Sequence, residues 1–464
     1  MEPLTNRTDI IQKEKGEKRE KSEKSEKREK GEKSEKREKS EKREKSEKRE
    51  KGEKSEKREK SENNKTHAIQ PSYIKLFSIP DECVLNFVDN LIENIFNEYT
   101  YINTVNNMKI KKKCIITNLL QAQKQFFESN KIENPIFYYN ISEENVNNIY
   151  NMCNDDKIDF SLFYEARRVI ELAKQNFLIY ENYEKCIFGN DYATKQEFEN
   201  YIKKYLNKNK IYDDKIQNTV VKIEFKEELI SAMQVVKKKN LYFLQIQNKK
   251  KIKKKMIPFL CNHEIGTHLI RMINHEKNNL KKYNIETCNI TEEGLAVINS
   301  MYSLKENKFL FLLTPALKYL TVCLAKFYTF SKLYIFLNDF IKDSEKCFNF
   351  CARVKRGLIN TAQPGCVYHD QFYFIGSYSI LKWYQNINFD LLYSGNIGLH
   401  SLKSISKFVN IKNNILPYFL SNQKKKVDYF KFLEQVSYVN GITPECCSFL
   451  CNRKKTITEK KRIK

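Results

Sequence analysis

Three residues within a six-residue stretch, 263–268, have the chemistry of a metal site. Residues 261–272 read CNHEIGTHLIRM and contain His263, Glu264 and His268. Two neutral imidazoles are typical zinc ligands, and a glutamate beside the first can take a proton from the water that attacks a substrate. Because the chain has only six histidines in 464 residues, this pattern indicates the helix of a zinc hydrolase.

The spacing of the two histidines requires a distorted helix. Residues five positions apart point about 140° apart around a regular α-helix, whereas residues four apart differ by only about 40°. A π-helical turn of about 4.4 residues would bring His263 and His268 to one face, and Gly266 lies where this distortion is needed. Otherwise the two are buried core histidines, and the spacing alone leaves both interpretations open. The similar pair His275-Glu276 has no second histidine downstream and is predicted to lie on the surface.

A second segment offers a carboxylate as the third ligand. Residues 291–298 read TEEGLAVI, which predicts a helix with Thr291 as its N-cap and with Glu292 and Glu293 in its first turn. Two histidines and a carboxylate from a following helix form the ligand set of catalytic zinc sites, which keep a fourth position open. In the alternative interpretation, both glutamates only stabilise the helix dipole.

The remaining sequence predicts a helix-rich α+β fold with a small mixed sheet. Apolar residues recur at helical spacing, and short aromatic or β-branched runs between polar turns indicate strands. The predicted helices are 80–97, 114–129, 161–176, 195–206, 259–274, 291–303, 314–341 and 371–385, and the predicted strands are 220–225 and 241–247. Since the strand 241–247 directly precedes the helix with the two histidines, it is the expected edge to which an extended peptide would bind.

Composition divides the chain into four parts. Residues 1–66 form a charged low-complexity arm, and its segment 13–62 contains no apolar residue, so the arm is predicted to be disordered. A helical N-terminal lobe is expected for 73–190, the core with the candidate zinc site for 191–420, and a basic C-terminal extension for 421–464.

Charge and hydropathy restrict the possible environments of the protein. The net charge is +25, of which +19 lies outside residues 13–62, and a basic body favours encounters with acidic partners. The apolar region 309–341 is interrupted by lysines, so no uncharged run approaches the roughly 20 residues that span a bilayer. The chain opens without a secretory signal, and its 13 cysteines form no repeating framework. A cytoplasmic protein with reduced thiols and no membrane span is therefore expected.

Three motifs in order resemble one known family. HEIGTHLIR at 263–271, TEEGLA at 291–296 and RVKRGLINTAQPGCVYHDQFYFIGSYSIL at 353–381 are similar to the microtubule-associated tyrosine carboxypeptidase family, whose bacterial relatives carry a Gln-Glu-Gly-Leu-Ala motif. Weaker similarity upstream extends the resemblance over roughly residues 75–410. This sequence departs from the family in a lysine-rich insert at 249–255 and in a shorter gap between 267 and 291.

The resemblance implies a zinc metallopeptidase with a thermolysin-like core. By motif, His263 and His268 match the zinc histidines, Glu264 the catalytic glutamate and Glu293 the third ligand. The implied activity is that of a carboxypeptidase that removes a C-terminal tyrosine or other aromatic residue from α-tubulin. The expected protein is a monomeric, cytoplasmic, cytoskeleton-associated enzyme that acts on the acidic tail of α-tubulin or on microtubules.

A carboxypeptidase must also hold the terminal carboxylate of its substrate. Candidates are Arg353, Lys355, Arg356 and His369, because basic side chains, and the fork of arginine above all, bind carboxylates. The lysines of 249–255 are expected to line the mouth of the cleft. The alternative function is a non-enzymatic protein that binds microtubules or nucleic acid and has a vestigial zinc site. No RNA-binding aromatic signature or zinc-finger spacing supports specific nucleic-acid binding.

Overall fold

The computed structural model of the chain describes most of the sequence that follows the charged arm. The described residues are 115–142, 158–211 and 220–446, apart from 228, 230, 240, 249–250, 284 and 286, together with a few positions in 82–89, at 144–146 and at 450. They belong to one compact unit. The predicted arm 1–66 lies outside the described residues, as does most of the predicted helix 80–97, whose described positions are helical.

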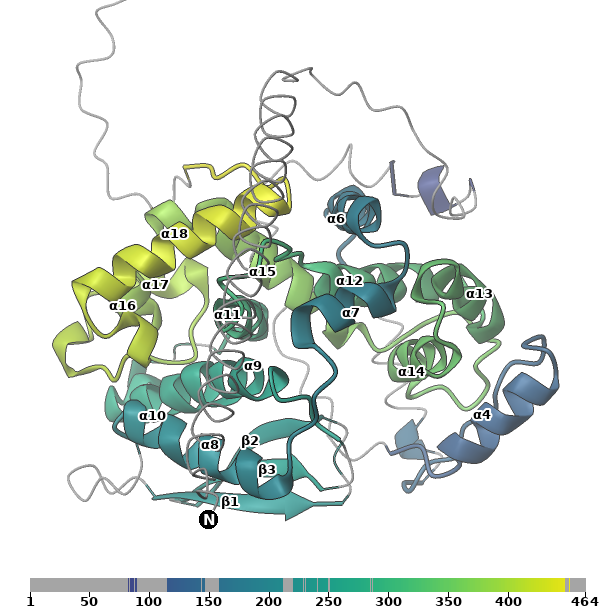
Figure 1. Cartoon of the computed structure of the whole chain (residues 1–464), viewed down its shortest axis with the longest axis horizontal. Helices are drawn as coiled ribbons and strands as arrows, with labels where there is room; N and C mark the ends of the chain where they lie inside the picture. Colours follow the sequence, from purple (N-terminus) through teal and green to yellow (C-terminus); the bar gives the residue numbers. More distant parts are fainter. Residues whose placement is uncertain are drawn as a thin grey trace, which may run out of the picture. The chain divides into compact units, whose positions relative to one another are not determined.

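Helices dominate the described part of the chain (Figure 1). The α-helices are α4 Leu119–Glu128, α6 Phe163–Asn176, α7 Tyr180–Phe188, α8 Lys195–Lys208, α9 Met256–His263, α10 Ile270–Lys277, α11 Asn289–Tyr302, α12 Leu313–Ala325, α13 Phe330–Ile341, α14 Ser344–Lys355, α15 Gln371–Trp383, α16 Phe389–Leu392, α17 Leu402–Ile405 and α18 Gln423–Val439. A π-helix, η1 Glu264–Leu269, joins α9 to α10. Short 3-10 turns are η2 Leu280–Tyr283, η3 Tyr368–Asp370, η4 Tyr384–Asn386, η5 Leu399–Ser401, η6 Ile411–Asn413 and η7 Tyr418–Leu420.

The three strands form a small mixed sheet, as predicted. They are β1 Val220–Lys226, β2 Met233–Lys238 and β3 Leu241–Gln247, in the order β1-β3-β2. β1 pairs with β3 in parallel, and β2 pairs with β3 antiparallel. The prediction that 241–247 is an edge strand is wrong, because β3 lies between the other two. The missed strand β2 supplies one open edge instead.

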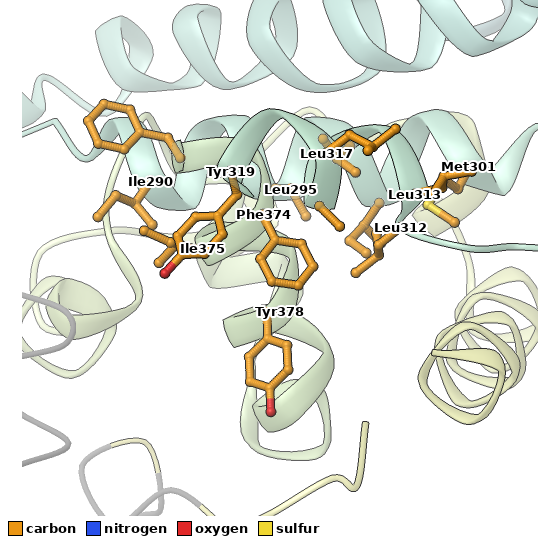
Figure 2. Close-up of a cluster of buried hydrophobic side chains, with 14 of the residues drawn as sticks. Ile290, Leu295, Met301, Leu312, Leu313, Leu317, Tyr319, Phe374, Ile375 and Tyr378 are labelled. Atoms are coloured by element: carbon orange, nitrogen blue, oxygen red, sulfur yellow. The ribbon is translucent and has the colours of Figure 1, made fainter. Parts of the chain in front are cut away.

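The core around the candidate site is built from α11, α12 and α15. Figure 2 shows their apolar side chains packed together, among them Leu295, Leu317 and Phe374, which are fully buried. α11 and α15 approach closely at two glycines: a Cβ on Gly294 would lie 2.1 Å from a backbone atom of Gly376. The glycine of the Glu-Gly-Leu-Ala motif is therefore required by the crossing of these two helices.

The long helix predicted for 314–341 is two helices, α12 and α13. α12 ends at Ala325, and Thr329 caps α13 by accepting a hydrogen bond from the backbone N–H of Lys332. The buried Lys355 Nζ donates to the carbonyl oxygens of Ala325 and Tyr328 at 3.0 and 2.6 Å. A side chain from α14 thus binds carbonyls that the break leaves without helical partners.

Other predicted elements agree with the structure, while the outer boundaries differ. α4, α6 and α8 confirm the helices predicted at 114–129, 161–176 and 195–206. α18 begins beyond the predicted core limit at 420, yet Tyr429, Leu433 and Val436 are fully buried, so the core continues into this helix. The lobe boundary at 190 stays a prediction.

Among the described helices, none combines the length and the apolar character needed to cross a membrane.

Candidate functional site

The π-helix η1 brings the two histidines of the zinc motif together. α9, η1 and α10 run as one continuous helical segment, and η1 begins at Glu264, directly after His263. The ring centres of His263 and His268 are 4.9 Å apart. The predicted π-helical distortion is confirmed, since a regular α-helix would point these rings about 140° apart.

A buried hydrogen-bond network stabilises the π-helix. Thr267 Oγ1 donates to the carbonyl oxygen of Asn262 at 2.9 Å, and the Tyr393 hydroxyl donates to that of Gly266 at 2.8 Å. Asn299 Nδ2 lies 2.8 Å from both Thr267 Oγ1 and the Tyr393 hydroxyl. These side chains satisfy carbonyl groups within the distorted turn and connect it to α11.

Loss of the Tyr393 hydroxyl is expected to weaken this network. Tyr393→Phe leaves the Gly266 carbonyl oxygen and one Asn299 donor without their buried partner, which should lower the free energy of unfolding by about 1–3 kcal/mol. Chemical denaturation of the zinc-free protein measures this change. The exposed Tyr438→Phe is the control and should leave stability unchanged. Equal stability of both variants would contradict a role of Tyr393 in holding the π-helix.

His263, His268 and Glu293 converge on one point. One ligand atom from each lies within 4.8 Å of the other two. Glu293 Oε2 is 3.6 Å from His263 Nε2 and 3.7 Å from His268 Nε2. This oxygen is buried and makes no hydrogen bond to any described residue. Burial opposes its ionisation, but the two imidazoles outweigh burial and lower the pKa of Glu293 to about 2.

This arrangement fits a zinc ion. Tetrahedral zinc with bonds of about 2.0–2.1 Å places its N and O ligands roughly 3.4 Å apart, close to the two distances from Glu293. A buried carboxylate oxygen without a hydrogen bond is explained by a cation at this position. Both imidazoles use Nδ1 for other contacts, His263 with Ser300 Oγ at 3.2 Å and His268 with Glu292 at 2.8 Å. Their Nε2 atoms therefore face the shared point.

Glu292 makes specific side-chain contacts, which a role limited to stabilising the helix dipole does not predict. The N-cap of α11 is Cys288, so the prediction of Thr291 as N-cap is wrong and Glu292 lies inside the first turn. Its Oε1 contacts His268 Nδ1, and its Oε2 accepts a hydrogen bond from Arg271 Nη1. Arg271 is fully buried and also donates to two carbonyls of the 395–397 loop. Glu292 is thus an outer partner of a candidate zinc ligand.

Glu264 lies beside this cluster at the open edge of β2. It is buried, and its Oε2 accepts a hydrogen bond from the backbone N–H of Val235 at 3.1 Å. Burial raises the pKa of Glu264, while the nearby His268 and His263 lower it. A raised pKa makes this carboxylate a better proton acceptor, which suits a general base.

A cavity of about 200 Å³ opens beside His263. Its walls come from α7, α9, α11, α12, α15 and the segment before α12, and they are mainly aromatic and aliphatic. The aromatic residues include Tyr180, Tyr183, Phe188, Phe259 and Phe311, and the polar ones include Ser300, Lys318 and Tyr373. The sequence carries no signal for this cavity, because its lining residues come from distant segments with no common motif.

Two of the four predicted substrate residues, Arg353 and His369, are affected by the charge of Glu293. Arg353 forms a two-pronged ion pair with Asp370. Burial lowers the pKa of His369; the charge of Glu293 opposes this shift, while Arg353 and Arg356 add to it. Glu293 is thus electrostatically coupled to His369 and Arg353, and Arg356 is coupled to His369.

Lys355 does not take part in the cluster. Its Nζ is buried and donates to four backbone carbonyls, the two at the end of α12 and those of Gln363 and Gly365. This geometry gives Lys355 a structural role in place of the predicted contact with substrate.

The remaining predicted basic residues and the second histidine pair also lie elsewhere. Lys254 pairs with Glu197 at 2.8 Å, and no described lysine of 249–255 lines the cavity, whereas residues 249 and 250 lie outside the described part. His275 is only 7% exposed, so its prediction as a surface residue is wrong. Glu276 binds the Tyr242 hydroxyl at 2.7 Å.

Comparison with known proteins identifies a family for most of the described chain. Residues 157–438 match the family model described as "Microtubule-associated tyrosine carboxypeptidase". The matched segment contains the two histidines, Glu264, Glu293 and the whole lining of the cavity.

Individual relatives cover a similar part of the sequence. "Putative tyrosine carboxypeptidase MATCAP2" of Mus musculus is 29% identical over 72% of this chain, and the match spans 63% of that relative's length. "Microtubule-associated tyrosine carboxypeptidase 1" of Mus musculus is 27% identical over 73% of this chain and 71% of its own. The Homo sapiens protein of that name is 28% identical over 70% of this chain and 67% of its own. The chain thus spans less than two thirds of the first of these relatives.

Proposed function

The chain belongs to the microtubule-associated tyrosine carboxypeptidase family, and from this premise we propose that it is a zinc-dependent carboxypeptidase that removes a C-terminal aromatic residue from an acidic protein tail. The observation that carries the proposal is the buried convergence of His263, His268 and Glu293 beside Glu264. Three ligands with an adjacent carboxylate base are the constellation of a hydrolytic zinc site.

The residues of the site have distinct roles in the proposed reaction. His263, His268 and Glu293 would hold zinc, which would supply a Lewis acid for the scissile carbonyl. Glu264 takes a proton from the attacking water and passes it to the amine of the departing residue. The backbone N–H of Val235 orients the Glu264 carboxylate for both transfers.

The same geometry supports a thermolysin-like core. Two histidines and a glutamate come from one helical segment, the third ligand comes from a following helix, and the edge of a mixed sheet lies against the base. β2 is the edge that faces Glu264, since the Val235 N–H points away from β3. An extended substrate is therefore proposed to lie along β2, whereas the sequence had favoured β3.

The substrate proposed for this chain is the C-terminal tail of α-tubulin, alone or in microtubules. The names of the relatives support a C-terminal tyrosine and an association with microtubules. A net charge of +19 outside residues 13–62 favours encounters with an acidic tail. The proposed location is accordingly the cytoplasm, on the cytoskeleton, and a monomer is proposed for the oligomeric state.

Mass spectrometry of synthetic peptides tests the proposal directly. The zinc-loaded protein should shorten an acidic peptide that ends in Glu-Glu-Tyr by its last residue, and cleavage should slow as salt rises because exposed charges are screened within about 8 Å at physiological ionic strength. A neutral peptide that ends in Tyr is the control and should show little dependence on salt. If neither peptide is cut, the non-enzymatic binding function replaces the catalytic one.

A further inference from the structure

Three tyrosines line the cavity, and they differ in what their hydroxyls bind. The Tyr180 hydroxyl lies 2.8 Å from Thr314 Oγ1, and the Tyr183 hydroxyl donates to the carbonyl oxygen of Phe311 at 2.9 Å. The Tyr373 hydroxyl makes no hydrogen bond to any described residue. Tyr373 is only partly buried, and its oxygen is not one of the side-chain atoms that are sealed without a partner. This hydroxyl is therefore an accessible donor at the cavity wall.

α15 carries Tyr373 on the face that crosses α11. The two helices meet at Gly294 and Gly376, where a Cβ added to Gly294 would lie 2.1 Å from the backbone of Gly376. Tyr373 is three residues before Gly376, so it lies on the same face of α15 and about 4.5 Å from the crossing along the helix axis. Glu293 directly precedes Gly294 on α11. The close crossing thus brings the turn that carries Tyr373 next to the turn that carries a candidate zinc ligand.

The surroundings of Tyr373 keep its hydroxyl protonated. Burial is the main cause that raises the pKa of Tyr373, and the charges of Glu293 and Glu264 raise it further. Asp370 acts in the same direction, while Arg353 opposes the shift. The two glutamates are the third candidate ligand and the candidate base of the site. A hydroxyl that stays protonated beside them is a hydrogen-bond donor and does not compete with Glu264 as a proton acceptor.

We propose that Tyr373 is a catalytic residue whose hydroxyl donates a hydrogen bond to the scissile carbonyl oxygen as negative charge develops on it. This inference rests on the proposed carboxypeptidase function and adds a donor to the groups that act on that carbonyl. The carbonyl must be within reach of both the base and the metal ligands, and the helix crossing holds Tyr373 beside them. A fixed donor contributes most when the charge is largest, so it should act on kcat more than on substrate binding.

The other polar groups of the cavity wall are less suited to this role. Ser300 Oγ donates to a carbonyl oxygen of its own helix at 2.6 Å and contacts a candidate zinc ligand. Glu184 forms an ion pair with Lys346, and its carboxylate would repel a developing negative charge. Lys318 is engaged by the ring of Tyr373 and by a further partner. The Tyr373 hydroxyl can donate without the loss of an existing hydrogen bond.

Tyr373→Phe removes the hydroxyl and keeps the ring. With the zinc-loaded protein and a peptide ending in Tyr, kcat should fall about 10²- to 10³-fold and KM should change little, because a donor to the developing charge is lost. Wild-type kcat would overturn the proposal. A raised KM with unchanged kcat would also overturn it, since the hydroxyl would then bind the substrate in its ground state.

Stability of the zinc-free protein gives a readout that does not depend on turnover. Tyr373→Phe should unfold at the same denaturant concentration as the wild type, because its hydroxyl has no hydrogen-bond partner to lose. Tyr183→Phe should unfold at a lower concentration, since it leaves the carbonyl oxygen of Phe311 without its donor. If Tyr373→Phe is destabilised as much as Tyr183→Phe, the hydroxyl has a structural role and the proposal is overturned.

Tyr378→Phe is the matched control on the same helix. Tyr378 is 9% exposed, and its hydroxyl likewise makes no hydrogen bond to a described residue. It does not line the cavity. Its replacement should leave kcat, KM and stability unchanged. If Tyr378→Phe lowers kcat as much as Tyr373→Phe does, the assignment of Tyr373 is rejected.

A phosphinic pseudopeptide separates this inference from the catalytic proposal. Its tetrahedral, negatively charged phosphinate replaces the scissile amide, so it has the shape and charge of the transition state. In calorimetric titrations, zinc-loaded Tyr373→Phe should bind it about 10- to 100-fold more weakly than the wild type does, because one hydrogen bond to a charged group is lost. Glu264→Gln should bind the uncut peptide equally well with and without Tyr373→Phe.

The two proposals fail on different results of these titrations. If the wild type cuts no peptide but Tyr373→Phe weakens phosphinate binding, the proposed function fails and the contact of Tyr373 stands. If the wild type and Tyr373→Phe bind the phosphinate equally, the contact is rejected even when peptides are cut. Weaker binding of the uncut peptide in the double variant would place the hydroxyl on the bound substrate and reject its role in the transition state.

Discussion

Replacing Glu264 by glutamine is expected to lower kcat by about 10²- to 10⁴-fold while the protein keeps its zinc. The amide has nearly the same shape as the carboxylate, but it cannot take a proton from water. Glu264 is not one of the three residues that converge on the proposed zinc position, so the metal content should not change. Peptide turnover measured by mass spectrometry, together with zinc content by atomic absorption, checks both parts of the expectation.

Glu276→Gln provides the control for this substitution. Glu276 lies on α10, near the end of the same helical segment, and binds the hydroxyl of Tyr242. Its replacement should leave kcat and zinc content unchanged. Wild-type turnover by Glu264→Gln would exclude Glu264 as the base, and loss of zinc together with turnover would assign the defect to metal binding.

The parts of the site that sequence could predict are those within one helical segment or one motif. His263 and His268 are five residues apart, and only a π-helical turn brings residues with that spacing to one face. The spacing therefore made a distortion the condition for a metal site and left two core histidines as the alternative, and the structure has the distortion at Glu264–Leu269. The choice of Glu293 over Glu292 depended on the family motif, since both carboxylates suit a first helical turn equally.

The parts that sequence could not predict depend on contacts between distant segments. Two partners of Arg271 are the carbonyl oxygens of Gly395 and Ile397, more than 120 residues away. The cavity likewise draws its walls from α7, α9, α11, α12 and α15. No local periodicity shows which helices become neighbours, so the sequence could not show that these helices enclose a cavity.

Local sequence patterns also do not show where a run of helical spacing is divided into two helices. Apolar residues continue at helical spacing through 326–329, which predicted one helix over 314–341. α12 ends at Ala325, and Lys355 donates to the buried carbonyl oxygens of Ala325 and Tyr328 there. A lysine in a basic run of the sequence can thus be a buried structural group, and its charge alone does not distinguish this role from substrate binding.

Replacing Glu293 should weaken zinc binding more than replacing Glu292 does. Glu293→Ala removes one of three protein ligands and should weaken zinc binding by more than the roughly 10- to 100-fold that follows the loss of an outer partner. Glu292→Ala removes such a partner and should fall within that range, because His268 loses the contact at its Nδ1. Competition with a chelator of known affinity measures both losses without requiring turnover.

Removing Glu292 should also lower the stability of the protein, because Glu292 pairs with a buried arginine. Arg271 is fully buried and pairs with Glu292, so Glu292→Ala leaves a buried cation with only backbone carbonyls as partners. Glu292→Gln retains the shape and one acceptor oxygen, and it should lose less stability than Glu292→Ala. Its zinc affinity should still be reduced, because the amide polarises the His268 ring less than a carboxylate does.

Ser300→Ala is the matched control on the other histidine. Ser300 Oγ contacts His263 Nδ1 at 3.2 Å, longer than the 2.8 Å between His268 and Glu292. A neutral hydroxyl at that distance orients a ring less strongly than a carboxylate, so Ser300→Ala should weaken zinc binding less than either change at Glu292. Equal zinc affinity of Glu293→Ala and wild type would reject Glu293 as a ligand. Unchanged affinity of Glu292→Gln would show that Glu292 serves only to neutralise Arg271.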